Sequence, residues 1–363
     1  MVQSCDAGSL PFVGDFQKFL EGASNYGLVT SEGTRFFEKK IVDGFVDKVK
    51  VGIDVANYPQ HRDMNKMFFD MIEGLEKING GYIETAALTL KQGNGAIPEA
   101  FAVKNCSMEI YEKLGQPFKL RICITGPYTM SSFFVYKDKG TFTRLGNVLT
   151  QIVEANIFAI KQGGVRLVSV DEPVFGFVDD PLLDRGSEGR ENLLNAWESM
   201  MGKIRAKGAQ ACLHLHNTSD ELFWQAKALD VIESHVYDSF YQAKRTRELL
   251  ESTDKFLKAS ITVTDFDQLI RDRVVATSQQ KLNEISVNEK IADVWKSLSK
   301  KEIDPAIFIE DGELMKERLN KASETFGANR VLYAGPECGM RGFPTYESAL
   351  ECLRRVSKTV RSG

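Results

Sequence analysis

The sequence alternates short, β-branched apolar runs with longer segments of helical periodicity, and this alternation continues along most of its 363 residues. Strands that alternate with helices pair in parallel through right-handed crossovers. Eight such units favour an α/β fold of the closed (β/α)8 TIM-barrel type over an open doubly wound sheet. The eight predicted strands are 2–9, 51–57, 118–126, 166–171, 209–216, 230–236, 256–263 and 330–335.

Several segments between these strands carry apolar residues at helical spacing. We expect helices over 36–49, 67–75 and 222–229, and a last helix from about Tyr346 to the end of the chain. A further helix should end just before the strand at 209–216, because Gly208 follows Ile204 as a helix stop signal.

Two segments, 79–117 and 264–329, are too long for simple connections. We expect them to be insertions at the barrel mouth, where variation in loop length is tolerated and is usually functional. No linker rich in Pro, Gly or Ser divides the chain, which predicts a single barrel domain over residues 1–363.

Composition excludes several function classes. The 46 Lys and Arg residues against 50 Asp and Glu residues give a net charge of −4, which argues against a nucleic-acid partner. The sequence contains no run of about 18 apolar residues, so it predicts no membrane span. The first residues lack a secretory signal, and the six scattered cysteines contain no CxxC pair, so we expect reduced thiols and a cytoplasmic protein.

Three of the four histidines fall close together at predicted strand ends. His214 and His216 are two residues apart on one strand and therefore share a face, and His235 ends the next strand. Cys338 follows the last strand and could reach the same mouth. Imidazoles with one thiolate suit Zn²⁺, which predicts a zinc site, with Glu233 as a competing oxygen ligand.

Other polar residues at strand ends have both functional and structural interpretations. The turn at Gly8 and Ser9 could offer backbone N–H groups to a carboxylate. Asp171 and Glu172 end a strand and could serve catalysis or cap the following segment. We expect His61 to lie at the surface or in a substrate loop, not at the metal.

Five motifs occur in an order that resembles the catalytic barrel of cobalamin-independent methionine synthases. They are GSLP at 8–11, TGPYTM at 125–130, SVDEPVF at 169–175, HLHNTSDE at 214–221 and GPECGMRGFPTYESALECL at 335–353. The resemblance covers nearly the whole chain and extends to short "core" methionine synthases made of that barrel alone. It implies a (β/α)8 barrel and a zinc ion that activates a thiol.

The resemblance implies that His214 and Cys338 are zinc ligands. His216 stands where the family usually has Cys, and an ungapped alignment puts His235 at the position of the family's Glu ligand. For homocysteine, the resemblance implies contacts from Gly8, Ser9 and Asp171, with Asp171 also acting in catalysis. Tyr58 stands before Pro59, where the family has an acidic residue, and it is the fourth predicted substrate contact.

These residues together predict a zinc-dependent methyltransferase, methionine-synthase-like, with homocysteine as acceptor. Folate-using members carry a His shortly after the seventh strand that protonates the leaving group, and residues 261–268 contain none. A corrinoid needs no such proton, so a methylcorrinoid on a partner protein is the expected donor. The alternatives are alkyl transfer involving another small thiol such as coenzyme M, which Tyr58 and Arg62 motivate, and a non-catalytic metal-binding barrel.

Overall fold

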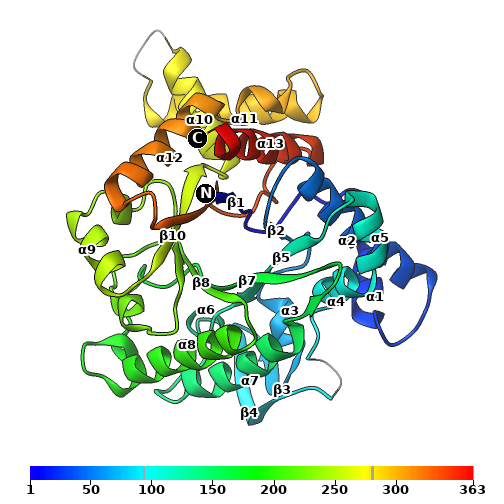
Figure 1. Ribbon diagram of the computed structural model, residues 1–363, viewed down its shortest axis with the longest axis vertical. Coiled ribbons are helices and arrows are strands. Elements are labelled where there is room, and N and C mark those ends of the chain that lie inside the picture. Colours follow the sequence, from blue (N-terminus) through cyan, green and yellow to red (C-terminus); the bar gives the residue numbers. More distant parts are fainter. Residues whose placement is uncertain (93–94, 279–281, 363) are drawn as a thin grey trace.

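The computed structural model describes residues 1–92, 95–278 and 282–362, and its centre is a curled sheet of eight parallel strands. Helices surround this sheet in Figure 1, with α7 and α8 on one side and α12 and α13 on the opposite side. Along the sheet the strand order is β1-β11-β10-β9-β8-β7-β5-β2. The central strands are β1 (Gln3–Ser4), β2 (Ala56–Asn57), β5 (Phe118–Thr125), β7 (Gly163–Glu172), β8 (Gln210–Leu215), β9 (Val231–Glu233), β10 (Phe256–Thr262) and β11 (Val331–Pro336).

Each of these eight strands lies at a region predicted to be a strand, so the predicted α/β pattern is confirmed. The two outer strands of the order are joined by one isolated parallel bridge between Cys5 and Val55, where Val55 N donates to Ser4 O at 3.0 Å. A short ninth strand, β6 (Ala159–Ile160), pairs antiparallel with the beginning of β7.

The helices cover the outside of the sheet. The longer ones are α1 (Phe16–Asn25), α2 (Glu32–Lys50), α4 (Pro98–Asn105), α5 (Ser107–Leu114), α7 (Thr141–Asn156), α8 (Glu188–Ala206), α9 (Lys244–Ser252), α10 (Phe266–Thr277), α11 (Glu284–Ser299), α12 (Gly312–Phe326) and α13 (Tyr346–Ser362). The shorter ones are α3 (Lys66–Phe69), α6 (Pro127–Ser131) and four single 3₁₀ turns at Pro181–Leu183, Leu222–Gln225, Ser239–Tyr241 and Pro305–Ile307.

Two predicted helices are wrong. The segment 67–75 is helical only in α3, and from Ile72 it forms β3 (Ile72–Ile78), which pairs antiparallel with β4 (Gly81–Leu90). Gly74 lies within β3 with a φ of +86°, a conformation that an α-helix does not contain and that only glycine adopts readily. The predicted helix over 222–229 is a single 3₁₀ turn, because the chain is already extended at Ala226.

The two long segments contain ordinary crossover helices as well as additions. Within 79–117, α4 and α5 pack on α2 and lead into β5, so only the β3–β4 hairpin is extra. That hairpin contacts the segment after β5 through the bridge between Tyr82 and Phe134. Within 264–329, α12 packs on β10 as a crossover helix should, and α10 and α11 are the addition.

The interior of the sheet holds buried charges below the strand ends. Glu233 is fully buried between Arg121, 2.8 Å away, and Lys258. Lys48 and Asp6 form a second fully buried ion pair at 2.6 Å. The first group joins β5 and β10 to β9, and the second joins α2 to the residues just after β1. These ion pairs therefore hold together segments that are far apart in the sequence.

Across the described ranges, no helix is both long enough and apolar enough to cross a membrane.

Candidate metal centre

The structure brings the side chains of His214, His216, His235 and Cys338 together. One ligand atom from each lies within 4.8 Å of every other, and the Cys338 Sγ lies 3.7 Å from the His216 Nε2. Tetrahedral zinc with bonds of about 2.0–2.3 Å needs donor atoms roughly 3.3–3.8 Å apart. The most widely separated donor atoms therefore need to approach one another by about 1.5 Å at most for the cluster to close around an ion.

Strand register explains why these residues meet. His214 on β8 pairs with Asp171 on β7 and with Glu233 on β9, so these three residues form one layer. Because side chains on a strand repeat every two residues, His216 and His235 belong to the next layer toward the mouth. Cys338 follows β11 directly and reaches this upper layer from its loop.

The chemistry of the donor set fits a metal ion. The Nε2 atoms of His214 and His235 are buried and have no hydrogen-bond partner. Burial lowers the pKa of His216 to about 2 and that of His235 to about 4, so these imidazoles are neutral and their ring nitrogens can donate to a metal. Burial also raises the pKa of the Cys338 thiol to about 12, so a nearby cation is needed to stabilise its thiolate.

Two carboxyl groups lie next to the histidines of the cluster. Asp171 Oδ1 is 3.6 Å from His214 Nδ1 and accepts a hydrogen bond of 2.6 Å from the Ser169 hydroxyl. Glu337 Oε2 is 4.0 Å from His235 Nδ1. A carboxylate at the far nitrogen of a ligand histidine fixes the tautomer and the orientation of the ring.

Glu233, the competing ligand, lies in the layer of His214, one layer below His216 and His235. Although burial raises its pKa, the charges of Arg121 and Lys258 outweigh burial and hold the pKa of Glu233 well below its usual range. Both of its carboxylate oxygens are in ion pairs, one with each cation. The described geometry therefore favours His235 as the ligand from this strand.

The predicted substrate contacts lie around the cluster in different environments. The turn after β1 contacts the Cys338 loop, because Met340 N donates to Ser9 O at 2.9 Å and Arg341 N donates to Ser9 Oγ at 3.2 Å. Gly8, with a φ of +111°, stands where a side chain would collide with Asn57. Tyr58 is fully buried, and its hydroxyl donates to the backbone oxygen of Cys123 at 3.0 Å.

Three other polar residues have structural contacts. His61 was expected at the surface or in a substrate loop, but it is 5% exposed, and its Nδ1 lies 3.2 Å from the carbonyl oxygen of Leu10. It packs there against aromatic side chains. Arg62 makes a two-pronged ion pair with Glu99, with both distances 2.7 Å. Glu172 accepts hydrogen bonds from two backbone N–H groups at the start of α6, so this carboxylate caps a helix earlier in the chain, whereas capping of the segment after it was expected.

Glu337 was not identified from the sequence. Its carboxylate accepts hydrogen bonds from Val236 N at 2.9 Å and from Thr264 N at 3.1 Å. It therefore ties the loops after β9 and β10 to the loop that carries Cys338. Its position directly before a candidate thiol ligand was the available signal, but a single glutamate beside a cysteine does not reveal which loops it contacts.

We predict that Glu337→Gln lowers zinc affinity by about tenfold while the protein stays folded. The amide of Gln can accept only one of the two backbone hydrogen bonds, which loosens the loops that carry His235 and Cys338. Competition with a chromophoric chelator measures the affinity. Glu313→Gln, an exposed position at the start of α12, is the matched control. Unchanged affinity in Glu337→Gln would show that the loops hold their positions without this carboxylate.

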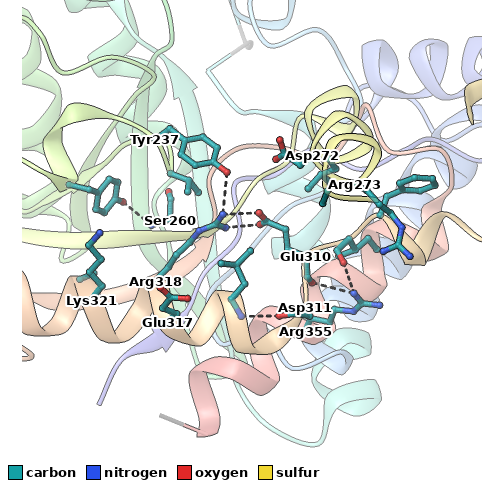
Figure 2. Close-up of a pocket in the computed structure, with 18 of the residues that line it drawn as sticks. Tyr237, Ser260, Asp272, Arg273, Glu310, Asp311, Glu317, Arg318, Lys321 and Arg355 are labelled. Carbon is teal, nitrogen blue, oxygen red and sulfur yellow. Dashed lines mark hydrogen bonds and ion pairs between the residues drawn. The ribbon is translucent and has the colours of Figure 1, made fainter. Parts of the chain in front are cut away.

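Two pockets meet at Tyr237, a second residue that the sequence did not single out. A pocket of about 440 Å³ lies against His216 and His235, and a larger one of about 970 Å³ lies between α10 and α12. Tyr237 lines both pockets. Figure 2 shows its hydroxyl facing Arg318, which in turn makes a two-pronged contact with Glu310.

Comparison with known proteins gives a likeness in structure and not in sequence. No protein-family model matches the chain, and no curated protein matches it either. One similar structure is a B12-independent methionine synthase from Shewanella sp. W3-18-1 in complex with selenomethionine, with a TM-score of 0.62 and 15% identity over 100% of this chain and 98% of that one. Another is a Listeria monocytogenes protein assigned as a vitamin-B12-independent methionine synthase, with a TM-score of 0.58 and 14% identity over 100% and 98% of the two chains. The chain therefore shares, along its whole length, the fold of B12-independent methionine synthase structures.

Proposed function

We propose that this chain is a zinc-dependent thiol methyltransferase of the cobalamin-independent methionine synthase family, acting as a single (β/α)8 barrel over residues 1–363. The observation that carries the proposal is the cluster of three histidines and one cysteine at the strand ends, with two buried ring nitrogens that lack any other partner. The shared fold with methionine synthase structures and the five motifs in family order support it.

His214, His216, His235 and Cys338 would hold the ion. When bound there, Zn²⁺ would bind the sulfur of the acceptor and favour its thiolate at neutral pH. Asp171 and Glu337 would orient the His214 and His235 rings from behind. The remaining task of the protein is to place the thiolate in line with the methyl group.

Homocysteine is the proposed acceptor, with Gly8, Ser9 and Asp171 at its amino-acid end. Ser9 contacts the Cys338 loop and Asp171 contacts His214, so both lie close to the cluster. The buried side chain of Tyr58 would line the site at the amino-acid end of homocysteine. Arg62, which motivated coenzyme M as an alternative thiol, is already paired with Glu99, so the structure offers that alternative no free guanidinium here.

The absence of a histidine from residues 261–268 favours a donor whose leaving group departs without a proton. A methylcorrinoid on a partner protein meets this requirement and is the donor proposed from the sequence. The two similar structures are described as B12-independent, which supports a donor other than a corrinoid. All six cysteines are free, as expected for a chain that works in the reducing cytoplasm.

The direct test measures zinc per chain in the purified protein and then follows methyl transfer from a panel of donors to a panel of thiols. Replacing zinc with Co²⁺ adds a second readout, because binding of a thiol changes the visible spectrum of the cobalt. One metal per chain, with a spectrum that responds to homocysteine, supports the proposal. A bound metal that no thiol perturbs supports the non-catalytic barrel instead.

We predict that Asp171→Asn lowers the use of homocysteine by about 10- to 100-fold, because an ammonium group loses its charged hydrogen-bond partner. Use of 2-mercaptoethanol, which has no amino group, should fall far less. The ratio of kcat/KM for the two thiols measures the difference. If both thiols lose activity equally, Asp171 acts through His214 and does not bind the amino group.

A further inference from the structure

The 440 Å³ pocket beside the cluster has an unusual lining. None of the proposed acceptor contacts, Gly8, Ser9, Tyr58 and Asp171, is among the residues that line it. Its lining residues are Phe177, His216, Asn217, His235, Tyr237, Asp238, Ser239, Val263, Asp265, Gln268 and Glu337. The Nε2 of His235, one of these residues, is buried without a partner.

Two aromatic rings flank this pocket, and both are open to solvent. Phe177 is 58% exposed and Tyr237 is 63% exposed, which is high for large apolar side chains. The guanidinium of Arg318 lies 5.7 Å from the Tyr237 ring centroid and its Nη2 lies 3.4 Å from the Tyr237 hydroxyl. Because Glu310 holds Arg318 through two bonds of 2.7 Å, Tyr237 rests against a fixed group (Figure 2).

The charged residues of the lining are all acidic. Asp238 accepts hydrogen bonds from the backbone N–H groups of Thr218 and Phe240, at 3.0 and 2.7 Å. Asp265 caps α10 and is exposed. The lining includes three acidic residues, with Glu337 the deepest, and neither lysine nor arginine among the described residues that form it.

We infer that this pocket binds the methyl donor and that the donor is a small onium cation, a sulfonium or a quaternary ammonium. Aromatic faces combined with carboxylates are the chemistry that recognises methylated cations. A volume of about 440 Å³ suits a small molecule. The inference rests on the proposed function, since the pocket adjoins the place where the acceptor sulfur would lie.

The transfer balances without any further reactant. The acceptor thiolate forms a bond to the methyl carbon, the bond from that carbon to the sulfonium sulfur breaks, and its electron pair stays on the departing neutral sulfide. No proton is needed at the leaving group, in agreement with the absence of histidine from 261–268. An anion and a cation become two neutral products, so the step creates no new charge at the leaving group.

Other donors fit the pocket less well. A folate carries carboxylates that Asp238 and Asp265 would repel, and it needs protonation of the leaving amine. A corrin ring with its side chains is much larger than this pocket and would have to stay outside it. Both donors serve as comparison arms of the experiment.

The first experiment measures binding of tetramethylammonium and of uncharged tert-butanol to the full chain loaded with zinc and homocysteine. We expect tetramethylammonium to bind at least about tenfold more tightly than tert-butanol, and we expect its binding to weaken with added salt. Asp265→Asn should weaken the binding of tetramethylammonium about threefold, because Asn still caps α10 but carries no charge. Asp15→Asn, the same change at the exposed cap of α1, is the control.

Tyr237 provides an independent variant pair. Tyr237→Leu should weaken the binding of tetramethylammonium about two- to fivefold. Tyr237→Phe should leave the affinity for this cation unchanged, because the ring remains. Equal affinity for the cation and for tert-butanol, or equal effects of Leu and Phe, would overturn the inference.

The second experiment supplies trimethylsulfonium, methylcobalamin or 5-methyltetrahydrofolate with homocysteine and measures methionine. Methionine from trimethylsulfonium alone supports the inference. Methionine from methylcobalamin or the folate but not from trimethylsulfonium overturns the inference and leaves the proposed function standing. No methionine from any donor, with no response of the cobalt-substituted protein to thiols, overturns both.

Discussion

Replacing either Cys338 or His214 with alanine should abolish the retention of zinc through dialysis, although the chain should still fold. His214 supplies a buried ring nitrogen that has no other partner, and Cys338 is the one anionic ligand in the cluster of described residues. Loss of Cys338 removes the ligand charge that balances Zn²⁺, and loss of His214 leaves only two imidazoles and one thiolate to hold the ion. Metal analysis of each purified variant measures the loss.

The matched control is Cys106→Ala, which removes a half-buried thiol at the start of α5, outside the cluster. It should keep one zinc per chain. Circular dichroism shows whether each variant is folded, so that loss of zinc through unfolding is recognised. Full zinc content in folded His214→Ala and Cys338→Ala would mean that the four side chains lie together for another reason.

The sequence was sufficient to predict the strands and to predict that the four candidate metal ligands lie at one edge of the sheet. Alternation of strands with helices fixes parallel pairing, and the spacing of two between His214 and His216 fixes their common face whatever the details of packing. Cys338 directly follows β11, so the end of that strand carries it toward the same edge as the histidines.

What the sequence could not give were features decided by contacts between distant segments. The spacing of Met67, Met71 and Leu75 suits a helix, but β4, ten residues long, pairs with Ile72 onward and overrides that local preference. In the same way, nothing near Tyr237 in the sequence reveals that Arg318 lies beside it, 81 positions away.

The choice between Glu233 and His235 was left open by the sequence for a physical reason. Arg121 and Lys258 each lie in a strand of mostly apolar residues, so the sequence alone does not show that either is a partner for a carboxylate. Only the folded sheet shows that both point inward and bind Glu233. The upper layer is thereby left to His216 and His235, and this division between layers can be tested directly.

We predict that Glu233→Gln destabilises the protein by about 3–5 kcal/mol yet retains one zinc per chain. The loss arises because Arg121 and Lys258 remain fully buried and lose the charge that lies between them. His235→Ala should show the opposite pattern, with zinc affinity strongly reduced and stability changed little, because its side chain is 28% exposed and has no other bond to lose. Denaturant unfolding of the metal-free proteins and chelator competition separate the two effects.

The two variants serve as controls for each other, because they lie two residues apart on the same strand end and differ in layer. If Glu233 were the ligand, Glu233→Gln would lose zinc, and His235→Ala would retain it. Charge on Glu233 would then have to be shared between the metal and two buried cations, and both of its oxygens are already in ion pairs. Binding zinc through Glu233 would therefore require breaking at least one fully buried ion pair, at a cost that His235, with its free ring nitrogen, avoids.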